Sequence, residues 1–485
     1  MSKASMAVLS RSDIEKVHDT SLRMLSEIGF RIDSPTVLRF LMEAGVRADE
    51  KKQLVFLTER QVDNALKSAP RTVRICSRGG KDYTIPREGV QLMSTDGQPA
   101  AVFDSRTRKK RPSKLQDLIN LTILADALPE VDYIWPPVVA TDMPPDKSSY
   151  FEFLASIAHS SKHIQHAAAT ADEANFQIEV GAAILGSREK LERRPIISNV
   201  CTPISPLRYD LGEVEGMVTL AKAGIPVVQL SMGIAGSVTP VSIAGTLAVV
   251  NAENLCGLAI TQFANPGAPS IYSSFSGVTD LKSGVFLCGT PEGVLMDTAA
   301  AEMARHYSLP CSAGGPGTAS RTISMEAGYQ SAMTAMASLL TGSDMLVGLG
   351  GFDRSGIESM EKLVMDCELW RWLKRLRDGI TVDEESLGFN AMMRQGPGGT
   401  FLSDPHTLKF MRKDLMIPQV TGYHSPGQPD YSKNDLDSYA AKRVKEILKT
   451  HKPQLLDKET AKRVGSVAKK YGIVAKGGRQ IFPSA

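Results

Sequence analysis

The sequence has few cysteines, and they are widely spaced. Its six cysteines lie at positions 76, 201, 256, 288, 311 and 367, so the closest pair is 23 residues apart. Paired-cysteine zinc motifs and dense disulfide frameworks need much shorter spacings. The spacing therefore predicts reduced, mostly buried thiols and no cysteine metal site.

The chain also lacks strongly charged and strongly apolar segments. Lys plus Arg total 56 against 53 Asp plus Glu, and the basic residues are scattered apart from 106–111 and the last fifty residues. The N-terminus has no signal-type apolar core, and no run of eighteen apolar residues occurs. We therefore expect a soluble cytoplasmic protein that binds neither nucleic acid nor membrane.

From about residue 115 onward, apolar runs alternate with helical patterns. Seven strand candidates follow one another at intervals of 31 to 43 residues, and helical patterns cover stretches such as 209–223, 240–263, 291–307 and 325–340. The strand candidates begin near Val131, His163, Pro195, Pro226, Pro269, Pro310 and Met345. This spacing is that of βα units, so we predict an α/β fold with a TIM (βα)8 barrel. Two runs compete for the eighth strand, one at Gln91-Leu-Met and one at Phe401-Leu-Ser.

The two ends of the chain have a different character. Residues 1–112 predict a small α+β cap region, with a helix over 11–28 capped by Ser12 and short β-rich runs near Leu54, Thr72 and Val90. The barrel is expected over 113–415. Residues 416–485 predict a Lys-rich helical tail, either a solvated charged surface or a partner-docking element.

In a TIM barrel the active site gathers at the carboxyl ends of the strands. The residues after the strand candidates include no carboxylate pair and no histidine trio, and the chain has no GxSxG motif. Metal-assisted and serine-based hydrolysis are therefore hard to build. Aromatic residues make up only 6% of the chain, yet five fall at or near strand ends: Tyr133, Trp135, Tyr272, Phe275 and Phe352. Their π-faces suit a quaternary ammonium ligand, with ordinary core packing as the alternative.

The glycine-rich loop that starts at Cys311 carries a further candidate site. It contains Gly314, Gly315, Gly317 and Arg321 before a helical pattern. Such a loop either cradles a phosphate or lets a bulky partner cofactor approach the backbone closely. Composition alone leaves these two interpretations open.

Several longer motifs occur in a characteristic order. They are NVCTPISPLRYD (199–210), GIAGSVTPVSIAGTLAVVNAENLCG (233–257), GTPE (289–292), YSLPCSAGG with MEAGYQSAM (307–333), SGIESMEKLVMDCELW (355–370) and PGGTFLSDPHTL (397–408). Over roughly residues 10–415 the chain resembles the trimethylamine methyltransferase family.

The resemblance implies a TIM barrel that transfers a methyl group from a methylated amine to cob(I)alamin carried by a separate corrinoid protein, with no tightly bound cofactor. The trimethylamine members carry pyrrolysine on the loop corresponding to about 314–324, where this chain has ordinary residues. It therefore resembles the branch without pyrrolysine, which uses quaternary amines such as glycine betaine, proline betaine and carnitine. A quaternary nitrogen already carries the charge of a good leaving group, so transfer needs orientation and no general acid.

On this hypothesis we assign no catalytic and no metal-binding residues. The expected substrate-binding residues are Gln98, Trp135, His166, Phe275, Arg321, Phe352 and Arg354, and the corrinoid is expected to approach at Gly314, Gly315 and Gly317. Arg321 and Arg354 would bind a betaine carboxylate. Gln98 is alternatively a turn residue, and His166 a buried core histidine.

Glycine betaine is the leading substrate, and two other classes remain open. The first is a barrel that binds a methylated ammonium without catalysis, and the second a barrel enzyme with a phosphate ligand at 314–319. The oligomeric state is not fixed by the sequence, and a homo-oligomer is compatible with it.

Overall fold

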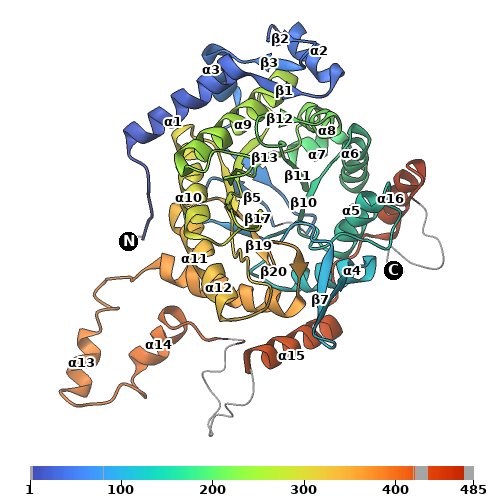
Figure 1. Ribbon diagram of the computed structural model, residues 1–485. Helices are drawn as coiled ribbons and strands as arrows, with labels where there is room; N and C mark the ends of the chain where they lie inside the picture. The colour runs from blue at the N-terminus through green and yellow to red at the C-terminus, as the bar shows by residue number, and fades with distance from the viewer. Residues whose placement is uncertain (1–3, 80, 419, 421–434, 474–485) are drawn as a thin grey trace.

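The apolar runs of the sequence form the strands of a closed barrel. The structure is a computed structural model that describes residues 4–79, 81–418, 420 and 435–473. Eight strands pair in parallel around the barrel, and helices surround them (Figure 1). In chain order the strands are β6 (Leu92–Thr95), β9 (Tyr133–Ile134), β10 (His163–Ala167), β11 (Ile197–Cys201), β13 (Val227–Ser231), β15 (Ser270–Ser274), β18 (Cys311–Gly314) and β19 (Met345–Leu349). The predicted TIM barrel is confirmed.

The eighth strand is β6, which closes the barrel between β19 and β9. Its register pairs Leu92 with Met345 on one side and Ser94 with Tyr133 on the other. The expectation of a strand at Gln91-Leu-Met is therefore confirmed, and the alternative at Phe401 is wrong because this residue precedes a turn that leads into a helix. The segment 1–112 thus supplies one barrel strand besides its own elements. The division at residues 112 and 415 stays a prediction.

Each barrel strand is followed by at least one helix on the outside. These helices are α4 (Leu115–Ala127), α5 (Ser148–His159), α6 (Ala171–Leu185), α7 (Arg188–Arg193), α8 (Leu211–Lys222), α9 (Ile243–Ala264), α10 (Pro291–His306), α11 (Met325–Thr341) and α12 (Met360–Asp378). Most begin at a Ser, Thr or Asp whose side chain accepts a hydrogen bond from the first turn, as Asp210 does for α8. Only α9 is long and apolar enough to cross a membrane among the described helices, but 83% of its most apolar window is buried in the protein. It is a core helix.

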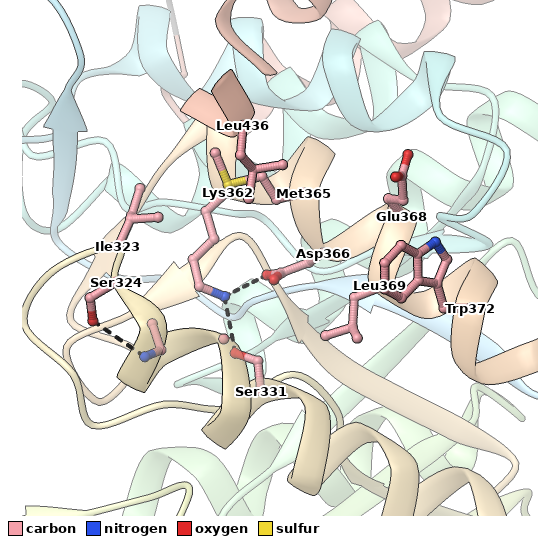
Figure 2. A pocket seen from close by; sticks show the side chains of 12 residues that line it. Ile323, Ser324, Ser331, Lys362, Met365, Asp366, Glu368, Leu369, Trp372 and Leu436 are labelled. Carbon is pink, nitrogen blue, oxygen red and sulfur yellow. Dashed lines mark hydrogen bonds and ion pairs between the residues drawn. The ribbon is translucent and has the colours of Figure 1, made fainter. Parts of the chain in front are cut away.

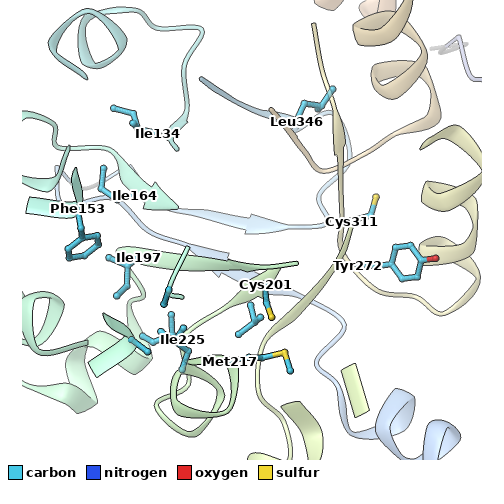
Figure 3. Packing of buried hydrophobic residues seen from close by; sticks show 14 of the residues in the cluster. Ile134, Phe153, Ile164, Ile197, Cys201, Met217, Ile225, Tyr272, Cys311 and Leu346 are labelled. Carbon is cyan, nitrogen blue, oxygen red and sulfur yellow. The ribbon is translucent and has the colours of Figure 1, made fainter. Parts of the chain in front are cut away.

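The two faces of the barrel strands build two different cores. Outward-facing side chains such as Ile164 and Ile197 pack against the helices, with Phe153 of α5 among them (Figure 3). Inward-facing side chains fill the barrel, and they include Tyr133, Val200 and Leu230. The alternation follows from the two-residue period of a strand, so it also fixes which polar residues face the interior.

The two ends of the barrel are covered differently. A hairpin of β4 (Val73–Ile75) and β5 (Tyr83–Ile85) packs its apolar side chains into the interior core, and β5 appears at the centre of the barrel in Figure 1. The carboxyl end instead carries two small sheets built from the loops that follow the strands. One contains β14 (Ile234–Ala235), β16 (Gly277–Asp280) and β17 (Val285–Leu287), and the other contains β20 (Gly351–Phe352), β21 (Ile357–Glu358), β7 (Ala101–Asp104) and β8 (Lys109–Pro112).

The N-terminal region begins with α1 (Arg11–Arg23), which continues as a π-helical turn over Met24–Ile28. The predicted cap at Ser12 is wrong, because Ser10 accepts a hydrogen bond from the Asp13 amide and Asp13 accepts one in return. The rest of this region is α2 (Pro35–Glu43), α3 (Glu59–Ser68) and a sheet of β1 (Phe30–Ile32), β2 (Arg47–Asp49), β3 (Leu54–Phe56) and β12 (Arg208–Tyr209). An ion pair of 2.6 Å between Arg208 and Asp33 ties β12 to β1.

After α12 the chain leaves the barrel and returns. Helices α13 (Phe389–Gln395) and α14 (Pro405–Asp414) project away from the barrel in Figure 1. The tail helices α15 (Asp435–Thr450) and α16 (Lys458–Lys470) lie against the outer helices, α15 beside α12 and α4 and α16 beside α6. A contact of 2.8 Å between His451 and Asp126 holds the tail to α4.

Candidate functional site at the barrel mouth

Three half-buried side chains face the mouth of the barrel. Trp135 directly follows β9, Met232 follows β13 and Phe275 follows β15, and all three pack on the apolar core inside the barrel. Residues at the carboxyl ends of different strands converge in this fold, so we treat the three side chains around this opening as one candidate surface. It is aromatic and apolar, and it lies where a TIM barrel binds its ligand.

Trp135 is held by the segment that follows β6. A Cβ atom on Gly97 would lie 2.6 Å from the indole ring, so only glycine allows this close contact. The indole Nε1 donates to Gln98 Oε1 at 3.4 Å, and Gln98 Nε2 donates to Glu152 Oε2 at 3.1 Å. Gln98 itself has a left-handed backbone with φ of 57°. Gln98 therefore lies beside the predicted aromatic residue and orients its ring.

The backbone around Phe275 is held by the half-buried carboxyl group of Asp297. Asp297 of α10 accepts hydrogen bonds from the Ser276 amide at 2.9 Å and the Ser274 hydroxyl at 2.8 Å, on both sides of Phe275. Burial raises the pKa of Asp297 to about 7, although these donors lower it. The ring lies over Gly314, where an added Cβ would come within 2.8 Å of it.

Two polar side chains without partners lie inside the barrel. Gln165 of β10 and Ser273 of β15 alternate with outward-facing neighbours and so point inward, and each residue is 1% exposed. Gln165 Oε1 and Ser273 Oγ have no hydrogen-bond partner within the described part of the chain. Buried polar atoms are normally paired, so these two atoms are suited to a polar group of a ligand.

A network of carboxyl groups lies beside the mouth, between β6 and α12. Lys362 and Asp366 form an ion pair of 2.6 Å in which both side chains are almost fully buried. Asp96, directly after β6, accepts a hydrogen bond from the Gly97 amide, and burial raises its pKa. Burial also raises the pKa of Glu358 well above its ordinary value, and in the described chain neither of its oxygens has a hydrogen-bond partner. Burial thus favours the protonated form of both Asp96 and Glu358 relative to the same groups in water.

A strained turn completes this wall. Asp353, Arg354 and Ser355 have positive φ angles of 50°, 63° and 57°, although none is glycine. Each such residue costs roughly 1–2 kcal/mol. The turn brings the Ser355 side chain to Asp96 and directs the Arg354 amide to the Thr318 carbonyl at 3.0 Å. Strained backbone residues tend to cluster at functional sites. The three residues of this turn connect β20 to the glycine-rich loop.

Four residues predicted from the sequence do not join the aromatic surface. The His166 ring points outward and packs edge-on against Phe153 at 5.7 Å, as the core-histidine alternative expects. Phe352 is 1% exposed and packs in a separate small cluster with Phe103. Arg321 is exposed, and Arg354 pairs with its neighbour Asp353. Trp135, Phe275 and Gln98 are therefore the residues that the structure brings to the mouth.

The three glycines predicted to admit the corrinoid are buried. An added Cβ on Gly315 would lie 2.8 Å from the Val347 carbonyl, so packing within the chain explains this glycine, as it does Gly314. Gly317 has more space, with its nearest neighbours 3.9 Å from such a Cβ. All three line a narrow cavity together with Phe275 and Asp297.

A separate groove of about 270 Å³ lies outside the barrel, between α11 and α12. Figure 2 shows apolar side chains such as Met365, Leu369 and Trp372 on its walls, with the Lys362–Asp366 pair at its base. The described residues include no cluster of three or more His, Cys, Asp or Glu side chains able to hold a metal ion. The groove lies outside the barrel, away from the carboxyl ends of the strands where this fold binds its ligands, so we do not place the substrate there.

Sequence reasoning missed the polar residues of the site. Asp96 was not considered because β6 was not secured as a barrel strand, although it directly follows that strand. Strand alternation along β10 would have identified Gln165, since Ile164 and His166 face outward. Asp297 and Glu358 lie on other elements and have no signal in the sequence alone.

Comparison with known proteins agrees with this geometry. The model of the trimethylamine methyltransferase (MTTB) family matches residues 2–470. The glycine betaine methyltransferase of Desulfitobacterium hafniense (strain Y51) is 29% identical over 454 residues, covering 93% of this chain and 94% of the relative. The trimethylamine methyltransferase of D. hafniense (strain DSM 10664 / DCB-2) is 27% identical over 474 residues, covering 96% and 95%.

A solved structure shares the fold. The crystal structure of the Methanosarcina barkeri monomethylamine methyltransferase superposes with a TM-score of 0.51 and 12% sequence identity, covering 96% of this chain and 88% of that one. The family model spans nearly the whole chain, and the barrel has the expected architecture. The chain belongs to the trimethylamine methyltransferase family and is a methyltransferase.

Proposed function

We propose that the protein transfers a methyl group from a quaternary amine, with glycine betaine as the leading substrate, to cob(I)alamin on a separate corrinoid protein. The observation that carries the proposal is the aromatic and apolar surface of Trp135, Met232 and Phe275 at the mouth. A quaternary ammonium has no N–H group to donate, so it is stabilised by π-faces. Proline betaine and carnitine are the nearest alternative substrates.

The electrostatics of the site support a substrate that also carries a carboxylate. Burial raises the pKa values of Asp96, Glu358 and Asp297, which reduces the repulsion between these carboxyl groups and an anionic ligand. Inside the barrel, the Gln165 amide and the Ser273 hydroxyl offer hydrogen-bonding groups beneath the aromatic side chains. We propose that the substrate carboxylate accepts hydrogen bonds from the Ser273 hydroxyl and the Gln165 side-chain N–H group, in place of Arg321 and Arg354, which lie outside the aromatic surface.

The chain's contribution to the chemistry is orientation. The ammonium group rests on Trp135 and Phe275, and the inward polar groups hold the other end of the substrate. One methyl group then points out of the mouth, where the corrinoid supplies the cobalt nucleophile. The C–N bond breaks with its electron pair left on nitrogen, so the product is a neutral tertiary amine such as dimethylglycine. No proton is transferred in this step.

The test is methyl transfer by the purified protein. We would mix it with cob(I)alamin and, separately, glycine betaine, proline betaine, carnitine and trimethylamine, and follow methylcobalamin by its absorbance. Transfer from glycine betaine with no transfer from trimethylamine is the expected result. Transfer from trimethylamine alone would refute the proposal. Betaine binding without transfer, also with a cognate corrinoid protein present, would support the non-catalytic alternative.

All six cysteines are free and buried, which suits the cytoplasmic location we infer.

A further inference from the structure

The segment from 376 to 417 forms an arm that projects from the barrel. Arg375 Nε donates to the Asp414 carbonyl at 3.0 Å, and Arg371 donates to the Ile417 carbonyl at 3.2 Å, so α12 holds the returning end of the arm. Between these points α13 and α14 extend away from the barrel (Figure 1). The arm is therefore anchored at its base and free of the barrel along its length.

The arm has its own internal structure. Arg394 and Asp404 form an ion pair of 2.7 Å between α13 and the start of α14, and Gln395 donates to the same carboxylate at 2.9 Å. The rings of His406 and Phe410 stack at 4.4 Å. These contacts hold the arm in one shape, so a partner binds it without a large ordering cost.

The surface of the arm is unusually apolar. Eleven large apolar side chains between Leu376 and Ile417 are 51% to 88% exposed, and six of them are Ile380, Phe389, Met393, Leu402, Leu408 and Leu415. Together they expose roughly 450–900 Å² of apolar surface, at roughly 60–120 Å² for each fully exposed side chain. So much exposed apolar area on about forty residues indicates an interaction site.

A matching apolar surface lies on α11. Met325, Tyr329 and Met336 are 85%, 60% and 41% exposed, and their spacing of four and seven residues places them on one face of the helix. We propose that the arm of one copy packs on this α11 face of a second copy, so that two chains exchange arms in a symmetric dimer. Two such contacts bury at least the roughly 1,200–2,000 Å² of a stable interface.

The position of the arm argues for a second copy over a corrinoid protein. Helix α12 starts at the carboxyl end of β19, and at its other end Arg377 contacts Gln91, the residue just before β6. The base of the arm is therefore at the amino end of the barrel, opposite the mouth. A methyl acceptor must face the mouth, whereas the base of the arm lies at the opposite end of the barrel, so the arm is better placed to contact a second copy.

The test is the mass of the intact protein in solution, measured by light scattering after size-exclusion chromatography. We expect at least twice the 52.4 kDa of one chain. The double variant Phe389→Glu/Leu402→Glu and the single variant Tyr329→Glu should each weaken self-association at least tenfold and shift the mass to one chain. Ile28→Glu, at a residue 61% exposed in the N-terminal region, is the matched control and should keep the mass unchanged.

Circular dichroism and thermal unfolding would show that each variant is folded. A monomeric parent protein at tens of micromolar would overturn the proposal, and so would a folded arm variant that keeps the full mass. A folded Tyr329→Glu that keeps the parent mass would overturn α11 as the receiving surface. The measurement needs no substrate, so it stands or fails apart from the proposed reaction.

Discussion

Asp297 gives the sharpest test of how the aromatic surface is held. Its carboxyl group accepts hydrogen bonds on both sides of Phe275 and has a pKa raised from 3.8 to about 7 by partial burial. The folded protein therefore keeps this proton at pH values where the unfolded chain has lost it. Stability from this group is complete below about pH 4 and is lost as the pH rises to about 7.

The size of the effect follows from the shift. Each pH unit between the two pKa values costs about 1.4 kcal/mol, so between pH 5 and pH 8 the loss is about 3 kcal/mol. Asn at position 297 keeps an acceptor oxygen for the Ser276 amide but does not titrate. The difference in free energy of unfolding, parent minus Asp297→Asn, should therefore fall by about 3 kcal/mol over this range.

Urea unfolding at pH 5, 6, 7 and 8, followed by fluorescence and circular dichroism, measures this difference. Other buried acids titrate as well, but their effects cancel between parent and variant. Asp280→Asn is the control, because hydrogen bonds from Ser283 and Lys282 lower the pKa of Asp280 and leave it charged throughout. Parallel pH profiles for the parent and Asp297→Asn would refute the assignment of a buried neutral acid at this position.

Three further predictions follow from the structure. Trp135→Ala should raise KM for the quaternary amine about 5- to 30-fold, since a half-desolvated cation–π contact is worth about 1–2 kcal/mol. Trp135→Phe keeps a π-face and should raise KM less. Methylcobalamin formation measures both KM values, and equal increases would contradict a π-face role. Lys362→Met should cost about 3–5 kcal/mol of stability, because it leaves Asp366 buried without its cation. The double variant Lys362→Met/Asp366→Leu should recover much of this stability in thermal unfolding. A double variant less stable than Lys362→Met alone would argue against this pair. Ser10→Ala should destabilise the protein by about 1 kcal/mol in urea unfolding and Ser12→Ala by less than about 0.5 kcal/mol, and the reverse order would restore Ser12 as the cap.

The barrel architecture could be predicted because apolar strand runs and helical patterns alternate locally along the sequence. Seven apolar runs at regular intervals identified the βα units, whereas the one predicted helix cap, Ser12, is wrong because Ser10 takes that role. The strand β6 was harder, since it has four residues and is separated from β9 by a hairpin and α4. Its partners Met345 and Leu346 are about 250 residues away, and no local pattern encodes such a pairing.

The site could be predicted only in part. Trp135 and Phe275 follow recognised strands, so their position at the mouth was accessible from the sequence. His166 and Phe352 were chosen by the same rule, but side-chain direction decides whether a residue faces the interior, and one position along a strand reverses it. The other groups come from elements outside the barrel strands: Asp297 from α10, Glu358 from β21 and Lys362 from α12. Only the folded chain brings them together.

The place of β6 in the chain has a consequence for synthesis on the ribosome. Its partner β9 emerges soon afterwards, but β19 follows only about 250 residues later. Until then the nascent sheet has unpaired N–H and C=O groups along one side of β6 and along the most recent strand. Unpaired strand edges invite association with other chains. We therefore expect premature chain termination before residue 345 to yield aggregating fragments, and the last strand to convert an open, adhesive sheet into a closed one.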